Sequence, residues 1–104
     1  LAEMGFKTTA EMFDAVTKAY CEAEKLIAPD GVIKSGEAML KAYKTVPDIL
    51  YRDVIHASFG FGRYLLGCVW YKALFNEAPR THISKFDEPV SAENLQLIDK
   101  ILHE

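Results

Sequence analysis

Hydrophobic side chains recur at intervals of three and four residues near the start of the chain, and this spacing predicts an amphipathic helix over residues 8–28. Thr8 and Glu11 have the spacing of a capping box, in which side chains satisfy the free amides at a helix start. Pro29 and the turn after it end the pattern. The apolar positions are Met12, Phe13, Val16, Ala19, Tyr20, Ala23, Leu26 and Ile27. Polar residues occupy the opposite side, so we expect one buried face.

A short apolar pair, Val32 and Ile33, follows a glycine and predicts a short β-strand. A helix, a glycine turn and a short apolar strand in this order form the αβ half of a parallel-sheet unit. A second helix is expected over 35–46, with Ser35 as its cap and Pro47 at its end. This segment therefore indicates an α/β architecture.

A third helix is predicted over 59–75, the most apolar part of the chain, with Ser58 as its N-cap. Its hydrophobic residues fall on nearly all sides, which is typical of a buried helix. Residues 77–90 lack periodicity and form a loop of unusual length for a compact domain. A last helix follows, capped by Ser91. Its apolar stripe is Leu95, Ile98, Ile101 and Leu102.

The composition narrows the class of protein. A chain of 104 residues is one small domain or a part of a larger one, and its 50% hydrophobic content excludes a disordered tail. The net charge is −3 and the Lys and Arg residues are scattered singly, so we expect no nucleic-acid partner. No apolar run is long enough to span a membrane, and no secretion signal opens the sequence. We expect no membrane partner.

The two cysteines, Cys21 and Cys68, lie within helical apolar patterns and are interpreted as buried, reduced thiols. This favours a reducing compartment such as the cytoplasm, while secretion stays open if an upstream signal is missing. His82 and His103 have no partner ligands at metal-binding spacing. We therefore expect no metal and no cofactor.

A polar turn before the long apolar helix carries Asp53 and His56, three residues apart. A carboxylate in this position can accept a hydrogen bond from one imidazole nitrogen and leave the other free to take a proton from a nucleophile. The alternative is a histidine held by a nearby carboxylate for local stability. The turn precedes a buried helix, where loops often carry function on a rigid scaffold. We interpret the pair as the base half of a hydrolytic triad.

Three further residues flank this turn. Phe59 and Phe61 are candidates to line a pocket for an acyl or sugar group. Arg63, one helical turn further on, is a candidate to contact an anionic group. Packing of the rings and a solvated or salt-bridged arginine are the alternatives.

The run DVIHASFGFGRYLLGCVWYKALF resembles the last conserved block of SGNH (GDSL-type) hydrolases. That block is an Asp-x-x-His turn, then a small residue and Ser or Asn, then a C-terminal helix. The preceding run AYCEAEKLIAPDGVIKSGEAMLKAY is similar to the penultimate helix, strand and following helix of a bacterial branch. The likeness covers roughly residues 10–78.

The resemblance implies the C-terminal portion of a three-layer αβα, flavodoxin-like fold, mostly helical here with one or two short strands. His56 would be the general base, and Asp53 would orient it. The Ala57 position, often Pro in the family, is a minor departure. The family's Gly-Asp-Ser block, oxyanion glycine and Gly-x-Asn-Asp block have no counterpart in the sequence, which is the serious departure.

The sequence therefore predicts the C-terminal half of an SGNH-like esterase, inactive by itself, whose substrate is a small-molecule or carbohydrate ester. A first residue other than Met is compatible with a piece of a longer chain. The alternative is a small helical domain without catalysis that binds a partner protein or itself. Because the apolar faces of helices 8–28 and 59–75 would be partly uncovered, we expect a homo-oligomer.

Overall fold

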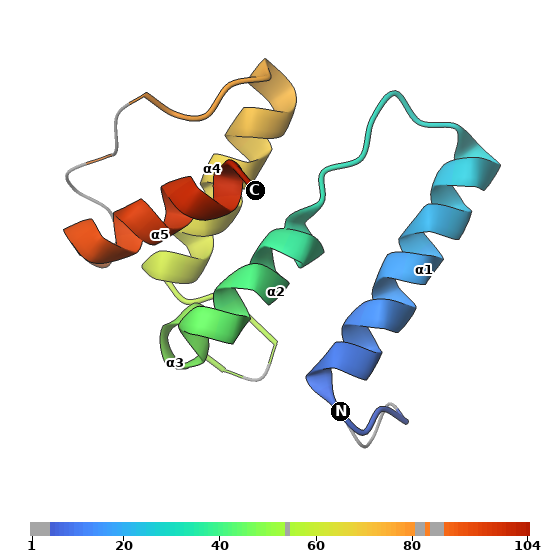
Figure 1. Cartoon of the computed structure of the whole chain (residues 1–104), viewed down its shortest axis with the longest axis horizontal. Coiled ribbons are helices and arrows are strands. Elements are labelled where there is room, and N and C mark those ends of the chain that lie inside the picture. The colour runs from blue at the N-terminus through green and yellow to red at the C-terminus, as the bar shows by residue number, and fades with distance from the viewer. Residues whose placement is uncertain (1–4, 54, 81–82, 84–86) are drawn as a thin grey trace. The chain divides into compact units, whose positions relative to one another are not determined.

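The computed structural model describes residues 5–53, 55–80, 83 and 87–104, and helices make up 64% of this part of the chain. They are α1 (Thr9–Ile27), α2 (Ser35–Thr45), α3 (Pro47–Leu50), α4 (Phe61–Phe75) and α5 (Ala92–Leu102) (Figure 1). The chain divides into two compact units, Leu1–Val32 and Ile33–Glu104. The first contains α1 and the second contains the other helices.

The expected α/β fold is wrong. No strand or sheet occurs in the described residues, and the nearest approach to one is an isolated antiparallel bridge between Tyr51 and Ala57. Val32 and Ile33 belong to an irregular segment between α1 and α2. A strand needs a neighbour to pair its backbone amides and carbonyls, and no described segment supplies one to this pair. The chain is a mostly helical small domain, not a flavodoxin-like fragment.

Helix α1 begins as its sequence predicts. The Glu11 amide donates to Thr8 Oγ1 at 3.1 Å, and the Lys7 amide donates to Glu11 Oε2 at 2.9 Å. Ala28 ends the helix in the left-handed region, with φ 45°. Of its apolar face Phe13 is buried, but Leu26 is 85% exposed and Ile27 is 72% exposed, so the face is not buried throughout as expected. Cys21 is also exposed, so its predicted burial is wrong.

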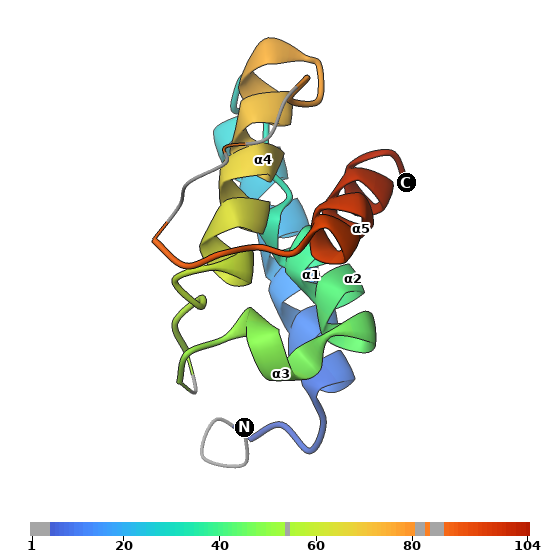
Figure 2. The same ribbon diagram turned by 90° about the vertical axis from the view of Figure 1, so that its left-hand side faces the viewer.

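The second unit has a common core to which each of its helices contributes. Leu50, Leu65 and Ile98, from α3, α4 and α5, are fully buried. Helices α2 and α4 each contact the other three helices of this unit (Figure 2). The last turn of α4 is joined to the end of α5, where Lys72 donates to the Leu102 carbonyl. The predicted stripe of the last helix is confirmed at Ile98, Ile101 and Leu102.

Helix α4 is not buried on all sides as predicted, and its buried residues lie in its first half, where Arg63 and Gly67 are still exposed. Tyr64, Leu65 and Cys68 are buried. Farther along, Trp70, Leu74 and Phe75 have more than half of their surface exposed.

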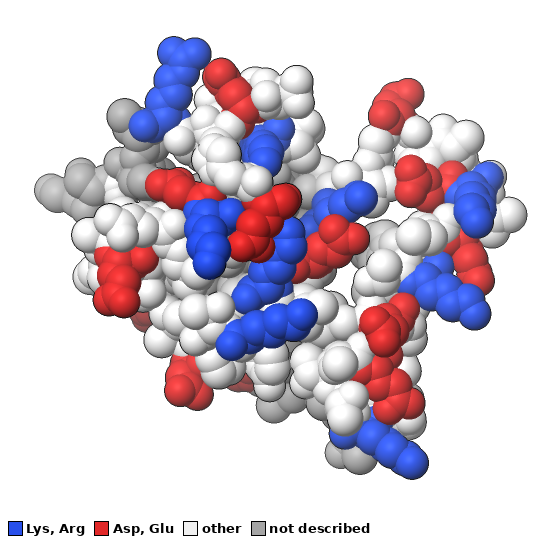
Figure 3. Space-filling model, viewed as in Figure 1, with Lys and Arg blue, Asp and Glu red and all other residues white. Residues whose placement is uncertain are grey.

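Among the described residues, no helix is sufficiently long and apolar to cross a membrane. On the face drawn in Figure 3, acidic and basic side chains are intermixed.

Two of the predicted caps, Ser35 and Ser58, are not the N-cap residues of their helices. The residue before α4 is Gly60. Lys34, not Ser35, is the residue before α2, and the Ser35 hydroxyl accepts a hydrogen bond from Trp70 Nε1 at 3.2 Å. Ser35 therefore connects α2 to α4. The predicted cap Ser91 is confirmed, because its Oγ accepts from the Asn94 amide at 3.1 Å.

Ser58 connects α3 to the start of α4. Its hydroxyl donates to the Ile49 carbonyl at 2.7 Å and accepts from the Gly62 amide at 2.8 Å. Its own amide donates to the Leu50 carbonyl at 2.9 Å. A Cβ atom on Gly62 would lie 2.3 Å from that carbonyl oxygen, far inside contact distance. The two helices can approach this closely only because residue 62 is glycine.

We predict that Gly62→Ala lowers the free energy of unfolding by about 1–3 kcal/mol, because the added methyl group forces the backbone of α3 away from α4. The measurement is urea denaturation followed by circular dichroism.

Gly67→Ala is the matched control in the same helix. A Cβ atom at this position meets nothing within 4 Å, so the substitution should raise the free energy of unfolding by about 0.5–1 kcal/mol. Equal effects of the two substitutions would contradict the close approach at Gly62.

Candidate functional site

The candidate site is the loop between α3 and α4. Its two arms run antiparallel, with a bridge between Tyr51 and Ala57 and a hydrogen bond from the Arg52 amide to the His56 carbonyl at 3.0 Å. Ser58 fixes the loop to both helices, as described above. The tip carries Asp53 and His56, while Val54 lies outside the described residues.

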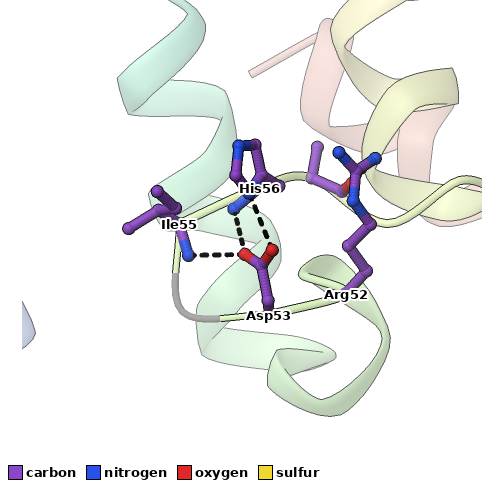
Figure 4. A network of polar contacts seen from close by, with 5 residues as sticks. Arg52, Asp53, Ile55 and His56 are labelled. Carbon is purple, nitrogen blue, oxygen red and sulfur yellow. Dashed lines mark hydrogen bonds and ion pairs between the residues drawn. The ribbon is translucent and has the colours of Figure 1, made fainter.

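Asp53 accepts three hydrogen bonds from the residues that follow it (Figure 4). Its Oδ1 accepts from the amides of Ile55 at 2.8 Å and His56 at 2.6 Å. Its Oδ2 contacts His56 Nδ1 at 2.7 Å. The amide bonds from His56 and Ile55, followed by the bond from the His56 ring, lower the pKa of Asp53 from 3.8 to about 2. The carboxylate is therefore ionised at neutral pH.

The contact with Asp53 assigns the proton on the neutral His56 ring. An ionised carboxylate only accepts hydrogen bonds, so Nδ1 carries the hydrogen and Nε2 has the free lone pair. In the part of the chain that the structure describes, nothing hydrogen-bonds to Nε2. Both side chains are about half exposed, at 54% for His56 and 47% for Asp53. The ring is thus oriented with its basic nitrogen accessible.

A nucleophile does not appear beside this pair in the described residues. The Oγ atoms of Ser35, Ser58 and Ser91 serve the structural bonds given above, and none contacts His56. Ser84 and His82 lie outside the described residues. No group of three or more His, Cys, Asp or Glu side chains in the described part of the chain could hold a metal ion.

The other three candidate residues, Phe59, Phe61 and Arg63, lie in different environments. Phe59 lies on the surface next to the turn, and Phe61 is a core residue with 4% exposure. Arg63 Nη1 donates to Asp87 at 2.6 Å, so this arginine is salt-bridged. The guanidinium carbons of Arg52 and Arg63 lie 4.2 Å and 5.6 Å from the centroid of the Phe59 ring.

A cavity of about 380 Å³ lies between this loop, the start of α4 and the segment before α5. Both candidate phenylalanines line it, while Asp53 and His56 do not. The charged and polar residues that also line it, which sequence reasoning missed, are Asp48, Arg52, Glu88 and Asn94. The proximity of Arg52 to the turn was visible in the sequence, but the segment around Glu88 reaches the cavity only through the fold.

We predict that neutral His56 carries its proton on Nδ1, and that Asp53 titrates near pH 2. Long-range ¹H–¹⁵N spectra distinguish the two tautomers, and the ¹³C shift of the carboxyl carbon reports the titration. Because the pKa of folded Asp53 lies below its ordinary value, its bonds stabilise the fold fully above about pH 4. That contribution is lost as the pH falls toward 2.

Asp53→Ala should remove the preference for the Nδ1 tautomer. His103 is the internal control, because its Nδ1 donates to the Asp99 carbonyl at 2.6 Å and should be unaffected. A His56 ring protonated on Nε2 in the unsubstituted protein would contradict the geometry described here.

Comparison with known proteins places the chain in a family. The model of the family described as a domain of unknown function, DUF4886, matches residues 5–104. No curated protein matches the chain. No solved structure matches it either. The family match includes all five helices and the loop with Asp53 and His56, and the chain therefore belongs to the DUF4886 family.

Proposed function

We propose that Asp53 and His56 are the acid–base pair of a serine-dependent ester hydrolase of the SGNH type. The observation that carries this proposal is the 2.7 Å contact between Asp53 Oδ2 and His56 Nδ1, which leaves Nε2 as an accessible base. The nucleophile and the oxyanion donors would come from a segment of the natural polypeptide outside these 104 residues. The substrate would be an O-acyl ester of a small molecule or a carbohydrate.

The pair would act in two half-reactions. His56 Nε2 takes the proton of the attacking serine hydroxyl, and Asp53 stabilises the imidazolium that forms. The tetrahedral intermediate collapses, the alcohol leaves with the proton from Nε2, and an acyl-enzyme results. Water then attacks the acyl-enzyme with His56 again as the base, which releases the acid and the serine.

The hydrogen bonds of Asp53 support this role. Two amides and one imidazole nitrogen hold the carboxylate in place, so it need not reorganise when the histidine becomes charged. Its lowered pKa, about 2, keeps the Asp53 carboxylate ionised at neutral pH. The sequence likeness of this segment to the Asp-x-x-His block of SGNH hydrolases is a second, independent support.

We predict that the isolated 104-residue chain has no esterase activity that depends on His56, because none of the described residues places a nucleophile beside the ring. In the natural polypeptide, a fluorophosphonate probe should label a serine outside these residues. His56→Ala or Asp53→Ala should then lower kcat/KM for an aryl acetate by roughly 10³–10⁴-fold. His103→Ala, at the residue that follows α5, is the matched control and should leave kcat/KM unchanged.

Two results would overturn the proposal. One is a natural polypeptide with an intact mass of 11.7 kDa, which leaves no room for a further segment. The other is a full-length enzyme whose ester hydrolysis survives both substitutions. In that case the Asp53–His56 contact would serve only the local stability of the loop.

A second candidate function is self-association without catalysis, and the exposed apolar side chains favour it. Tyr20, Leu26 and Ile27 are exposed on α1, and Trp70, Leu74 and Phe75 are exposed on α4. Large exposed apolar surfaces commonly mark sites of protein association. This function is compatible with the first, because an enzyme can also be an oligomer.

We predict that the chain forms a dimer or larger oligomer at micromolar concentrations, as measured by light scattering after size-exclusion chromatography. Leu26→Glu should weaken association by about 10-fold or more, because it places a charge on the apolar face of α1. Glu22→Gln, on the polar side of α1, is the control and should have little effect. A monomer at all concentrations would contradict this prediction.

A further inference from the structure

The Phe59 ring is flanked by two arginines that differ in their ionic partners. Arg63 pairs with Asp87 at 2.6 Å, so its charge is compensated. Arg52 lies closer to the ring, at 4.2 Å, and its Nη1 donates to the Ala57 carbonyl at 3.4 Å. In the described part of the chain, no carboxylate lies within ion-pair distance of Arg52. Its guanidinium is held in place while its charge is not neutralised.

A guanidinium held in this way keeps most of its binding capacity. It has five N–H donors in one plane, of which the Ala57 carbonyl takes one. Stacking on the Phe59 ring uses the face of the group and leaves the donors on its edge. Arginine stays charged at every physiological pH, and its planar fork matches the two oxygens of a carboxylate. Arg52 is therefore a preorganised donor for an anionic group.

Arg52 and Phe59 both line the cavity of about 380 Å³, a volume suited to a small molecule. Ile49, Phe61 and Val90 contribute apolar surface to the same cavity. This combination suits a ligand with one anionic end and an apolar body.

The two carboxylates that line the cavity affect which anion can bind there. Asp48 and Glu88 also line it and lie beyond ion-pair distance from Arg52. Two carboxylates repel an incoming anion, and they repel a dianion more strongly than a monoanion. The cavity therefore disfavours a phosphate dianion more than a single carboxylate, whose one charge Arg52 can pair with.

The position of Arg52 connects this cavity to the candidate base. Its amide donates to the His56 carbonyl at 3.0 Å, so the backbones of the two residues are held together across the loop. In the view of Figure 4, the Arg52 guanidinium and the His56 ring extend to the same side of the loop. A ligand anchored on Arg52 would lie beside the loop that carries His56.

We propose that Arg52 anchors a small organic carboxylate, whose apolar body occupies the cavity beside the Asp53–His56 loop. Carboxylate binding does not depend on catalysis by this chain. That the carboxylate belongs to the ester substrate rests on the proposed function. The inference thus names the substrate class as an ester that carries a separate carboxylate group.

The test is a ¹H–¹⁵N NMR titration of the chain with benzoate, at an ionic strength held constant with sodium chloride. We expect saturable shifts at the amides of Ala57 and Phe59. Arg52→Gln should weaken benzoate binding by about 10-fold or more, because it removes the charged fork. Arg63→Gln is the matched control on the same ring and should change the affinity by no more than about twofold, since solvent and salt screen this exposed arginine.

Two further probes separate the contributions to binding. Benzyl alcohol has the same ring without the charge, and inorganic phosphate has the charge without the ring. Both should bind at least about 10-fold more weakly than benzoate. Arg52→Lys retains the charge without the planar fork and should bind with reduced affinity, and it serves as a second variant if Arg52→Gln does not fold.

The inference is overturned if benzoate gives no saturable shift, if phosphate or benzyl alcohol binds equally well, or if Arg63→Gln and Arg52→Gln have equal effects. The tautomer of His56, measured in the same sample, separates this result from the proposed function. An Nδ1-protonated His56 without benzoate binding refutes only the carboxylate site. Benzoate binding with an Nε2-protonated His56 refutes only the acid–base pair.

Discussion

The two hydrogen bonds of the Ser58 hydroxyl hold α3 and α4 together in the second unit. The hydroxyl donates to the Ile49 carbonyl in α3 and accepts from the Gly62 amide in α4, so one atom fixes the distance between the two helices. The contact is possible because Gly62 has no side chain to meet the Leu50 carbonyl. The loop between these helices is closed at its base by the same contact. The candidate site is therefore a short loop that Ser58 fixes to two helices, and the proposed role of His56 as a base requires such a support.

Within this loop, two sets of contacts have separate tasks. Asp53 organises the tip through bonds to the two residues that follow Val54, and these bonds set both its own pKa and the orientation of His56. Arg52 is fixed by the opposite arm and by the Phe59 ring, and it faces the neighbouring cavity. Proton transfer and ligand recognition would thus be assigned to adjacent residues of one loop. The Asp53–His56 pair and Arg52 are exposed to solvent. A bound ligand or further protein would exclude water from them and so strengthen their electrostatic interactions.

The exposed apolar side chains are the observation behind the proposed self-association of this chain. Helix α1 and the second half of α4 expose large hydrophobic side chains, although the first half of α4 contributes several residues to the core. In the proposed function, the Asp53–His56 pair receives its nucleophile from a segment outside these 104 residues. The proposed self-association would cover the exposed side chains of α1 and α4.

The sequence by itself determined the features that depend on residues close together in the chain. The capped starts of α1 and α5 and the contact between Asp53 and His56 join residues three positions apart, so their spacing is sufficient to predict them. Tertiary structure decided the features that need a distant partner. Val32 and Ile33 have strand-forming side chains but no described strand to pair with. Arg63 is neutralised by Asp87, 24 residues away, while Arg52 is not, and no local pattern distinguishes the two. Burial, sheet pairing and charge compensation are properties of neighbours in space, and only the fold supplies those neighbours.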